Sequence, residues 1–213
     1  EASDIYWNAQ RQEIAGRGDD ALKSYARLLA RSPDSETAAS NLLNAAVREG
    51  SFADALAAVK AAQAAKQADS DGPLLILADA FRRKKWVEAD RALADLEREG
   101  DFAFMVPVLK GWLNVAQGRD SGILPQTFQA SGLTAYYGDD QSIYFDLADG
   151  NVTQAKLRLR NFRGYDEPHG RFLAGHAMGE FSRRGDTEFA SALGRQIGLD
   201  AGNYSTQPVT AGL

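Results

Sequence analysis

Few side chains in this sequence are of the types that bind metals or catalyse reactions. The two histidines, His169 and His176, are seven residues apart, a spacing that would place them on one face of a helix. Together with Asp166 or Glu167 they could bind a metal ion. His169 directly follows a proline and precedes a glycine, however, outside the helix expected for His176. We therefore expect a surface histidine and a packed histidine rather than a metal site.

Acidic side chains and glycine-rich segments could also catalyse a reaction or bind a ligand. Asp140 and Asp146 could serve as the paired carboxylates of a glycosidase, which need a rigid cleft between them. The acidic segments 139–140 and 165–168 do not have the spacing of a calcium-binding loop. Segment 16–20, GRGDD, lacks the lysine and the following hydroxyl residue of a phosphate-binding loop. These segments are predicted to be turns and surface loops.

The sequence contains no cysteine, which excludes a disulfide framework and a thiolate metal site. Nucleophiles, bases and metal ligands that could converge are therefore scarce, and an enzyme needs them. We expect a protein that is not an enzyme and that requires no metal ion or other cofactor.

Glycine and alanine recur at a fixed spacing that indicates which elements position these side chains. A glycine stands five residues before Ala21, Ala55, Ala155 and Ala190, and the first two of these pairs are 34 residues apart. Continuing in steps of 34 reaches Lys84 with Ala89 and then Gly118 with Ile123. Repeats of this length are typical of stacked helical hairpins. The four pairs are Gly16 and Ala21, Gly50 and Ala55, Gly150 and Ala155, and Gly185 and Ala190.

Each position of this pattern has a physical reason. A helix commonly ends in a left-handed backbone conformation, which costs a residue with a Cβ atom about 1 kcal/mol or more and so favours glycine. An alanine one turn into the second helix lets the two helices of a hairpin pack closely. Local chemistry and the long-range period thus agree on an all-helical chain. Between glycine and alanine stand residues that cap helix N-termini, namely Asp19, Ser51, Asn151 and Asp186.

The pattern resembles that of the tetratricopeptide repeat (TPR) family over most of the chain. Ala21, Tyr25, Leu28 and Pro33 match the family's second-helix pattern, and later repeats retain parts of it. The resemblance implies an all-α fold, a right-handed superhelical α-solenoid of about six hairpins; the alternative is a bundle of unrelated hairpins. The expected single domain, 1–197, comprises repeats at residues 3–34, 35–69, 70–101, 102–133, 136–168 and 169–197, followed by an irregular tail at 198–213.

The fourth repeat departs from the family pattern. Ile123 replaces the alanine, Pro125 falls inside the expected second helix, and Gly122 and Gly132 flank that segment. Proline and glycine both disfavour a helix interior. We expect a short helix or an irregular segment at this point.

In TPR proteins the first helix of each repeat lines the concave side of the superhelix, and the resemblance places a binding groove there. Amide side chains at inward positions can pair with a peptide backbone, and aromatic side chains supply flat apolar contact. Trp112 also has a structural interpretation, as a side chain packed between adjacent hairpins. The expected peptide-binding residues are Tyr6, Gln10, Asn44, Arg48, Arg82, Trp112 and Tyr144.

These features predict a non-enzymatic scaffold that binds a peptide segment or a partner protein in its concave groove. One alternative is a small-ligand or glycan-binding pocket formed by the fourth repeat and a loop at 120–140, where Trp112, Tyr136 and Tyr137 could gather. Another is an oligomerisation module that forms a homodimer through a terminal repeat.

The net charge of −5 and the isoelectric point near 5.1 argue against nucleic acid as a partner. The basic segments 82–85 and 157–163 are typical of a solvated helix end and a helix edge. No apolar run approaches about 18 residues, so no transmembrane segment is expected. The chain begins at Glu1, as a processed exported protein or a trimmed one would. Its alanine- and arginine-rich composition favours a periplasmic or envelope location in a bacterium over the cytoplasm.

Overall fold

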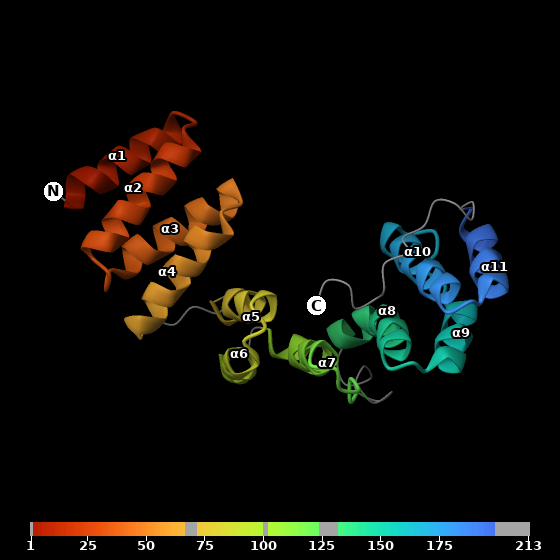
Figure 1. Ribbon diagram of the computed structural model, residues 1–213. Helices are drawn as coiled ribbons and strands as arrows, with labels where there is room; N and C mark the ends of the chain where they lie inside the picture. The colour runs from red at the N-terminus through yellow and green to blue at the C-terminus, as the bar shows by residue number, and fades with distance from the viewer. Residues whose placement is uncertain (1, 67–71, 100–101, 124–131, 199–213) are drawn as a thin grey trace. The chain divides into compact units, whose positions relative to one another are not determined.

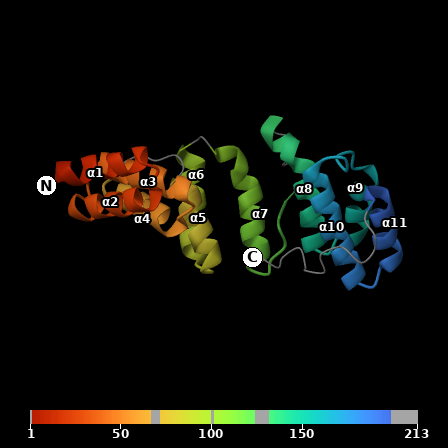
Figure 2. The same cartoon turned by 90° about the horizontal axis from the view of Figure 1, so that it is seen from above.

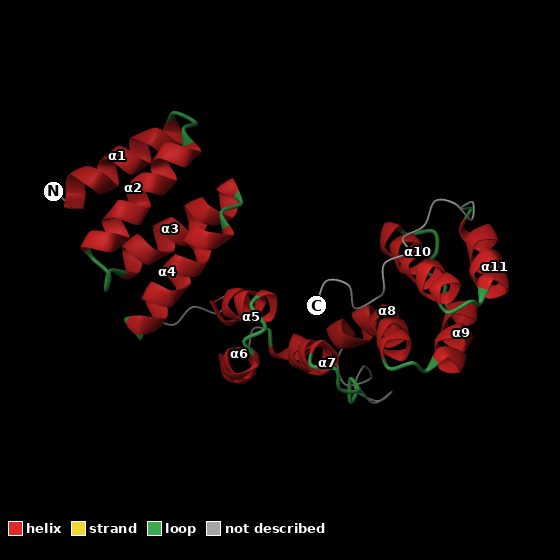
Figure 3. Ribbon diagram, viewed as in Figure 1, coloured by secondary structure: helices red, strands yellow, loops and turns green. Residues whose placement is uncertain are grey.

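The computed structural model describes residues 2–66, 72–99, 102–123 and 132–198. In these ranges every regular element is a helix and no strand occurs, which confirms the expected all-helical fold (Figure 3). Within the same ranges, no helix combines the length and the apolar character needed to cross a bilayer. The chain divides into two compact units, the N-terminal unit (Glu1–Ala103) and the C-terminal unit (Phe104–Leu213).

Three successive helix pairs form the N-terminal unit. Each helix packs against the next one along the chain (Figure 1). The core of the first two pairs is built mainly from alanine and leucine, with Tyr25 as its largest fully buried side chain. The helices are α1 (Ala2–Ile14), α2 (Gly18–Arg31), α3 (Glu36–Glu49), α4 (Phe52–Ala64), α5 (Gly72–Arg82) and α6 (Trp86–Glu99).

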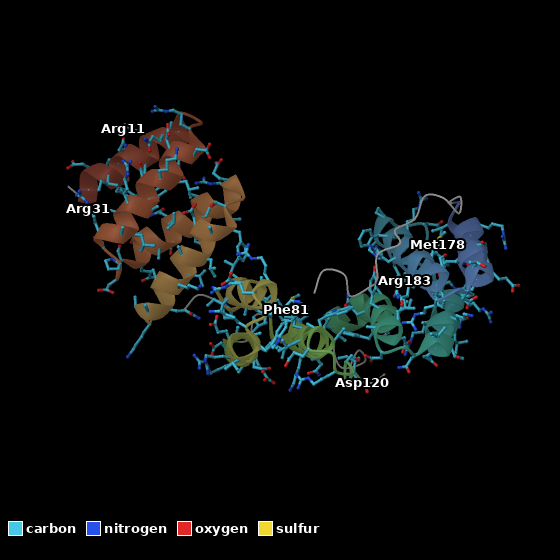
Figure 4. All side chains as sticks on the ribbon, viewed as in Figure 1. Arg11, Arg31, Phe81, Asp120, Met178 and Arg183 are labelled. Atoms are coloured by element: carbon cyan, nitrogen blue, oxygen red, sulfur yellow. The ribbon has the colours of Figure 1, made fainter. Side chains whose placement is uncertain are left out.

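In the C-terminal unit, α8 is the central helix. It packs against α7, α9 and α10, and α10 packs in turn against α11 (Figure 2). Leu159, Leu173, Phe181 and Met178, which is labelled in Figure 4, form the fully buried centre of the core. The elements are the short η1 (Ala103–Met105), α7 (Val106–Ala116), α8 (Gly132–Ala148), α9 (Val152–Asn161), α10 (Pro168–Arg183) and α11 (Thr187–Ile197).

The predicted left-handed turn positions are confirmed. An added Cβ atom would meet no other atom within 4 Å at any of the five turn glycines. Backbone conformation, and not lack of space, is therefore what requires glycine there. In the third repeat Lys84 adopts the same conformation, with φ of 55°, and Ala89 follows it at the usual five residues. The φ angles are 69° at Gly16, 69° at Gly50, 71° at Gly118, 78° at Gly150 and 85° at Gly185.

The predicted contact alanines are also confirmed, since all five are buried, with at most 3% of their surface exposed: Ala21, Ala55, Ala89, Ala155 and Ala190. The capping prediction is correct in position for three of its four residues. Ser51, Asn151 and Asp186 precede their helices, and the Asp186 carboxylate accepts a hydrogen bond from Phe189 N. The prediction for Asp19 is wrong, because α2 begins at Gly18 and places Asp19 inside the first turn, where its charge suits the helix dipole.

A glycine compensates for the missing alanine of the fourth repeat. A Cβ atom on Gly111 of α7 would lie 2.8 Å from both Ile123 Cγ1 and Phe145 Cζ. Ile123 and the buried Phe145 therefore occupy the space that a side chain at position 111 would need. In this hairpin the large residue, Ile123, stands where an alanine is expected, and the small residue, Gly111, stands on the first helix opposite it.

Residues 119–123 form no helix, as expected, and residues 124–131 lie outside the described ranges. Whether the fourth hairpin has a second helix therefore stays a prediction, as does the irregular tail beyond Gly198. The loop expected at 120–140 is wrong for its last part, because α8 begins at Gly132. No proline interrupts residues 132–148, and the buried Ile143, Phe145 and Leu147 anchor that helix in the core.

Candidate functional site

The predicted binding residues all lie on the first helices of the repeats, whose surface we call the first-helix face. In the N-terminal unit this face belongs to α1, α3 and α5, and in the C-terminal unit to α7, α8 and α10. The two units carry different side chains on it.

A hydrogen-bonded network occupies the first-helix face of the N-terminal unit. Gln10 Nε2 donates to the Tyr25 hydroxyl at 2.6 Å, and that hydroxyl donates to Glu13 Oε2 at 3.0 Å. Arg48 of α3 binds the other oxygen of Glu13. Burial, and secondarily the Glu13 carboxylate, raises the pKa of Tyr25 to about 12, so the phenol keeps its proton. The structure thus brings the predicted residues Gln10 and Arg48 together through two side chains that were not on the predicted list.

The other predicted residues of α1 and α3 lie around this network. Asn44 is exposed one helical turn before Arg48, on the same face of α3. Tyr6 is half-buried and meets the ring of Trp7 edge-on at 5.3 Å between centroids. The apolar side chains of Ile14 and Val47 are exposed beside the turns. This part of the face combines amide, charged and apolar groups within reach of solvent.

Arg82 is held by a buried carboxylate. Asp79, only 3% exposed, pairs with Arg82 of its own helix at 3.3 Å and with Arg83, the residue after that helix, at 3.1 Å. It also pairs with Lys60 of α4 at 3.5 Å. Burial alone would raise the pKa of Asp79, but the bonds and charges of Arg83, Lys60 and Arg82 outweigh it and hold the pKa below its usual value. The basic segment 82–85 is therefore more than a solvated helix end.

Arg82 additionally places its guanidinium over the ring of Phe52 in α4, 5.0 Å from the centroid. This contact and the Lys60 pair both connect α5 to the preceding helix. The predicted residue Arg82 is thus partly structural, although 67% of its side chain is exposed.

An aromatic row crosses the first-helix face of the C-terminal unit, and we use this name for Trp112, Tyr144, His176 and Phe172. The centroids of Trp112 and Tyr144 are 6.4 Å apart, those of Tyr144 and His176 are 6.4 Å apart, and those of His176 and Phe172 are 4.3 Å apart. The row therefore runs from α7 over α8 to α10. Its two predicted members, Trp112 and Tyr144, do lie together.

Trp112 is half-buried and packs against the next helix, α8, as its structural interpretation predicts. Its ring lies 4.6 Å from that of Phe145, and its Nε1 donates to Gln141 Oε1 at 2.8 Å. Trp112 thus fastens α7 to α8 while part of its ring stays on the surface. Phe172 and His176 were not predicted from the sequence, although their spacing of four residues on one helix was the available signal.

Acidic side chains lie beside the aromatic row. Asp140 Oδ2 is 3.7 Å from His169 Nε2, and Glu167 Oε2 is 3.8 Å from His169 Nδ1. Burial, followed by the charge of Asp140, raises the pKa of Tyr144 to about 12. The row is therefore bordered by carboxylates beside Tyr144 and at the start of α10.

The expectation that His169 lies outside a helix is wrong. Pro168 fits the first turn of a helix, where its missing N–H is not needed, and α10 begins there. His169 and His176 consequently share one helix, but they have different neighbours, Asp140 for the first and aromatic rings for the second. Among the described residues, no three histidine, aspartate or glutamate side chains are grouped so as to hold a metal ion.

A second buried carboxylate, Glu180, lies beneath the C-terminal unit's face. It is 2% exposed, binds Arg183, and accepts a hydrogen bond from Arg184 Nε at 2.6 Å. Arg184 also donates to the carbonyl of Leu147 at the end of α8, at 3.0 Å. As at Asp79, burial would raise the pKa of Glu180, but the two arginines hold it below its usual value.

The two carboxylates considered for glycosidase chemistry have separate partners. Asp140 lies beside His169, whereas Asp146 pairs with Arg158 of α9 at 2.7 Å. Burial raises the pKa of Asp146 against the opposing effect of Arg158, and the charge of Asp149 adds to the rise. Six residues on a helix correspond to a rotation of about 240°, so the two carboxylates point to different sides of α8.

Asp146 lines a cavity of about 350 Å³. The Asp149 carboxylate there accepts hydrogen bonds from the amide of Ser121 at 2.8 Å and from its hydroxyl at 2.6 Å. Trp112 does not line this cavity, and the side chains of Tyr136 and Tyr137 lie outside the described residues. The lining residues are Ser121, Ile123, Ser142, Phe145, Asp146, Asp149, Asn151, Gln154 and Arg158.

No known family, curated protein or solved structure matches this chain.

Proposed function

We propose that this chain is a TPR-like α-solenoid that binds a peptide segment or a partner protein on its first-helix face and performs no catalysis. The aromatic row carries the proposal, because it places rings from three helices side by side at the surface. Phe172, a large apolar side chain, is 66% exposed and adds its ring to this surface. Rings of this kind give a large contact area at a low cost in conformational entropy.

The polar network of the N-terminal unit supports the same proposal. Gln10, Glu13 and Arg48 are held in place by one another and by Tyr25. Side chains fixed before binding lose little entropy when a partner arrives. The recurrence of left-handed turns and buried alanines supports the TPR-like repeat, because each repeat then presents its first helix in an equivalent way.

Crosslinking and pull-down from the native lysate test this proposal. The variant Asn44→Ala, Arg48→Glu, Trp112→Ala is expected to lose a specific partner that the wild-type chain captures. Its control is Gln63→Ala, Arg91→Glu, Leu157→Ala, which alters an amide, an arginine and an apolar side chain that are exposed on second helices. Both variants must retain wild-type helicity by circular dichroism. An unchanged partner list for the first variant contradicts the proposal.

A second candidate function, the binding of a small polar ligand such as a sugar, is favoured by the cavity beside α8 and α9. Its lining combines carboxylates, an arginine, a glutamine and an asparagine, which suits hydroxyl groups. A thermal-shift screen with monosaccharides and polyols tests it. A stabilising sugar whose effect disappears in Gln154→Ala supports this function, and the absence of any shift argues against it.

A further inference from the structure

The aromatic row presents ring surface next to fixed negative charge. The indole N–H of Trp112 is already bonded to Gln141, so the exposed part of that residue offers only its ring. Asp140 lies one helical turn before Tyr144 on α8, close enough for its charge to act on that phenol. Glu167 adds a second carboxylate at the start of α10.

His169 lies between the two carboxylates, 3.7 Å from Asp140 and 3.8 Å from Glu167, and the arginines and lysine of the same helices are paired or lie on other sides. Arg183 and Arg184 bind the buried Glu180. Lys110 lies two residues before Trp112, about 200° around α7, and Arg171 lies one residue before Phe172, about 100° around α10. The row and its margin thus combine aromatic rings with carboxylates.

We propose that the aromatic row binds a basic segment of a partner, with an arginine or lysine side chain placed between the rings of Trp112 and Tyr144 and the carboxylate of Asp140. A ring face attracts a cation through its quadrupole, and a guanidinium can stack on a ring while it binds a carboxylate. An apolar side chain about one turn away in the same segment contacts Phe172. This inference rests on the proposed function and adds the chemistry of the partner.

The N-terminal unit provides an internal contrast. Its first-helix face exposes the arginines Arg48 and Arg82, whose side chains are 59% and 67% exposed. Arg48 is paired with Glu13, whereas Asp79 is shared by Lys60, Arg82 and Arg83, which leaves excess positive charge at α5. This charge disfavours a basic segment there, so we expect such a segment to prefer the C-terminal unit.

Fluorescence anisotropy with three labelled 12-residue peptides tests the inference on the full chain. The peptides share one leucine pattern and carry arginine, glutamate or glutamine at the remaining positions. We expect the arginine peptide to bind most tightly and to weaken as salt rises. Asp140→Asn and Phe172→Ala are each expected to weaken it about fivefold, because each removes one contact of modest strength. The control variants Glu188→Gln and Leu157→Ala, exposed on α11 and α9, are expected to stay within about twofold.

Equal binding of the three peptides, or equal effects of Asp140→Asn and Glu188→Gln, overturns the inference. The proposed function is separable from it. If the glutamate or glutamine peptide binds best and Phe172→Ala abolishes that binding, the face binds peptides but the partner is not basic. If no peptide binds while the native partner is still lost in the Asn44, Arg48 and Trp112 variant, the basic segment is again rejected and the binding face stands.

Discussion

Asp79 and Glu180 occupy the same position in their repeats, five residues before the turn at Lys84 and at Gly185. Each is buried, and each is followed by two arginines at three and four residues that bind it. The connection to the preceding helix pair differs between them. Asp79 receives the charge of Lys60 from α4, whereas at Glu180 an arginine donates to the Leu147 carbonyl of α8.

The same local arrangement, a buried carboxylate bound by two arginines, thus occurs in two units whose surfaces differ. The carboxylate anchors two arginines, and the neighbouring hairpin is linked by a third cation, Lys60, at Asp79 and by one of the two arginines, Arg184, at Glu180. In the N-terminal unit the connecting group is a half-exposed ammonium, which salt can screen. In the C-terminal unit the connection is a hydrogen bond from Arg184 to a carbonyl at the end of α8.

The largest effect is expected from removing a buried carboxylate. Glu180→Ala leaves Arg183 and Arg184 without their acceptor and a cavity in the core. We expect a loss of about 3 kcal/mol in the free energy of unfolding, the scale for breaking a buried ion pair. Urea unfolding measures it. Asp79→Ala serves as the comparison and should cost less, because its three cations are closer to solvent; an equal or larger cost would contradict this ranking.

The pH dependence of stability sharpens the same comparison. The pKa of Glu180 and that of Asp79 are lower in the folded chain than their usual values. Their stabilising contribution is therefore complete above the ordinary carboxyl pKa and is lost as the pH falls through the folded pKa. Urea unfolding between pH 7 and pH 3 should show Glu180→Gln clearly less stable than wild type at pH 7, with the difference shrinking toward acid pH. A constant difference would contradict the role of the charge.

Two glycines of the C-terminal unit should respond oppositely to the same substitution. Gly111→Ala forces a Cβ atom against Ile123 and Phe145, and we expect a loss of about 2 kcal/mol from overpacking. Gly175→Ala meets open space inside α10, and we expect a gain of about 0.5 to 1 kcal/mol from helix propensity. Thermal and urea unfolding measure both. If Gly111→Ala leaves the free energy of unfolding unchanged, the contact between α7 and α8 is loose.

The turns of the two compared repeats predict a smaller, reciprocal effect. Lys84 adopts a left-handed conformation that disfavours side chains, so Lys84→Gly should stabilise the chain by about 1 kcal/mol. Gly185→Lys should destabilise it by a similar amount. Urea midpoints of the two variants should shift in opposite directions, and shifts of the same sign would show that the two turns are not equivalent.

The smallest expected effect concerns Lys60. Lys60→Met removes one of three cations from Asp79 while keeping most of the side chain's length. We expect a loss of about 0.5 kcal/mol at low salt that vanishes near 1 M NaCl, because the ammonium is half exposed. Urea unfolding at the two salt concentrations measures the loss. If the loss persists in high salt, it comes from packing and not from the charge of Lys60.

The sequence was most informative where one residue type satisfies one backbone or packing demand. Turn glycines and contact alanines are such cases, and their conformation and burial were predictable from spacing alone. The start of α10 at Pro168 was missed because a proline can either end a helix or open one. The arginines of segment 82–85 were predicted as solvated because their carboxylate, Asp79, becomes buried only when α4 and α5 pack together.

The candidate site was predictable only in part, for similar reasons. The repeat offsets identified Trp112 and Tyr144, which do share a surface. Phe172 and His176 join them through the packing of α8 against α10, and no offset from the turn predicts that contact.

Site-specific photocrosslinking tests the central claim, binding on the first-helix face, most directly. A photoreactive phenylalanine analogue is placed at Asn44 or Phe172 on first helices, or at Gln63 or Leu157 on second helices, all four exposed. After illumination in the native lysate, we predict a discrete crosslinked partner from at least one first-helix position and none from the second-helix positions. A partner crosslinked equally from both sets, or only from Gln63 or Leu157, would contradict the account.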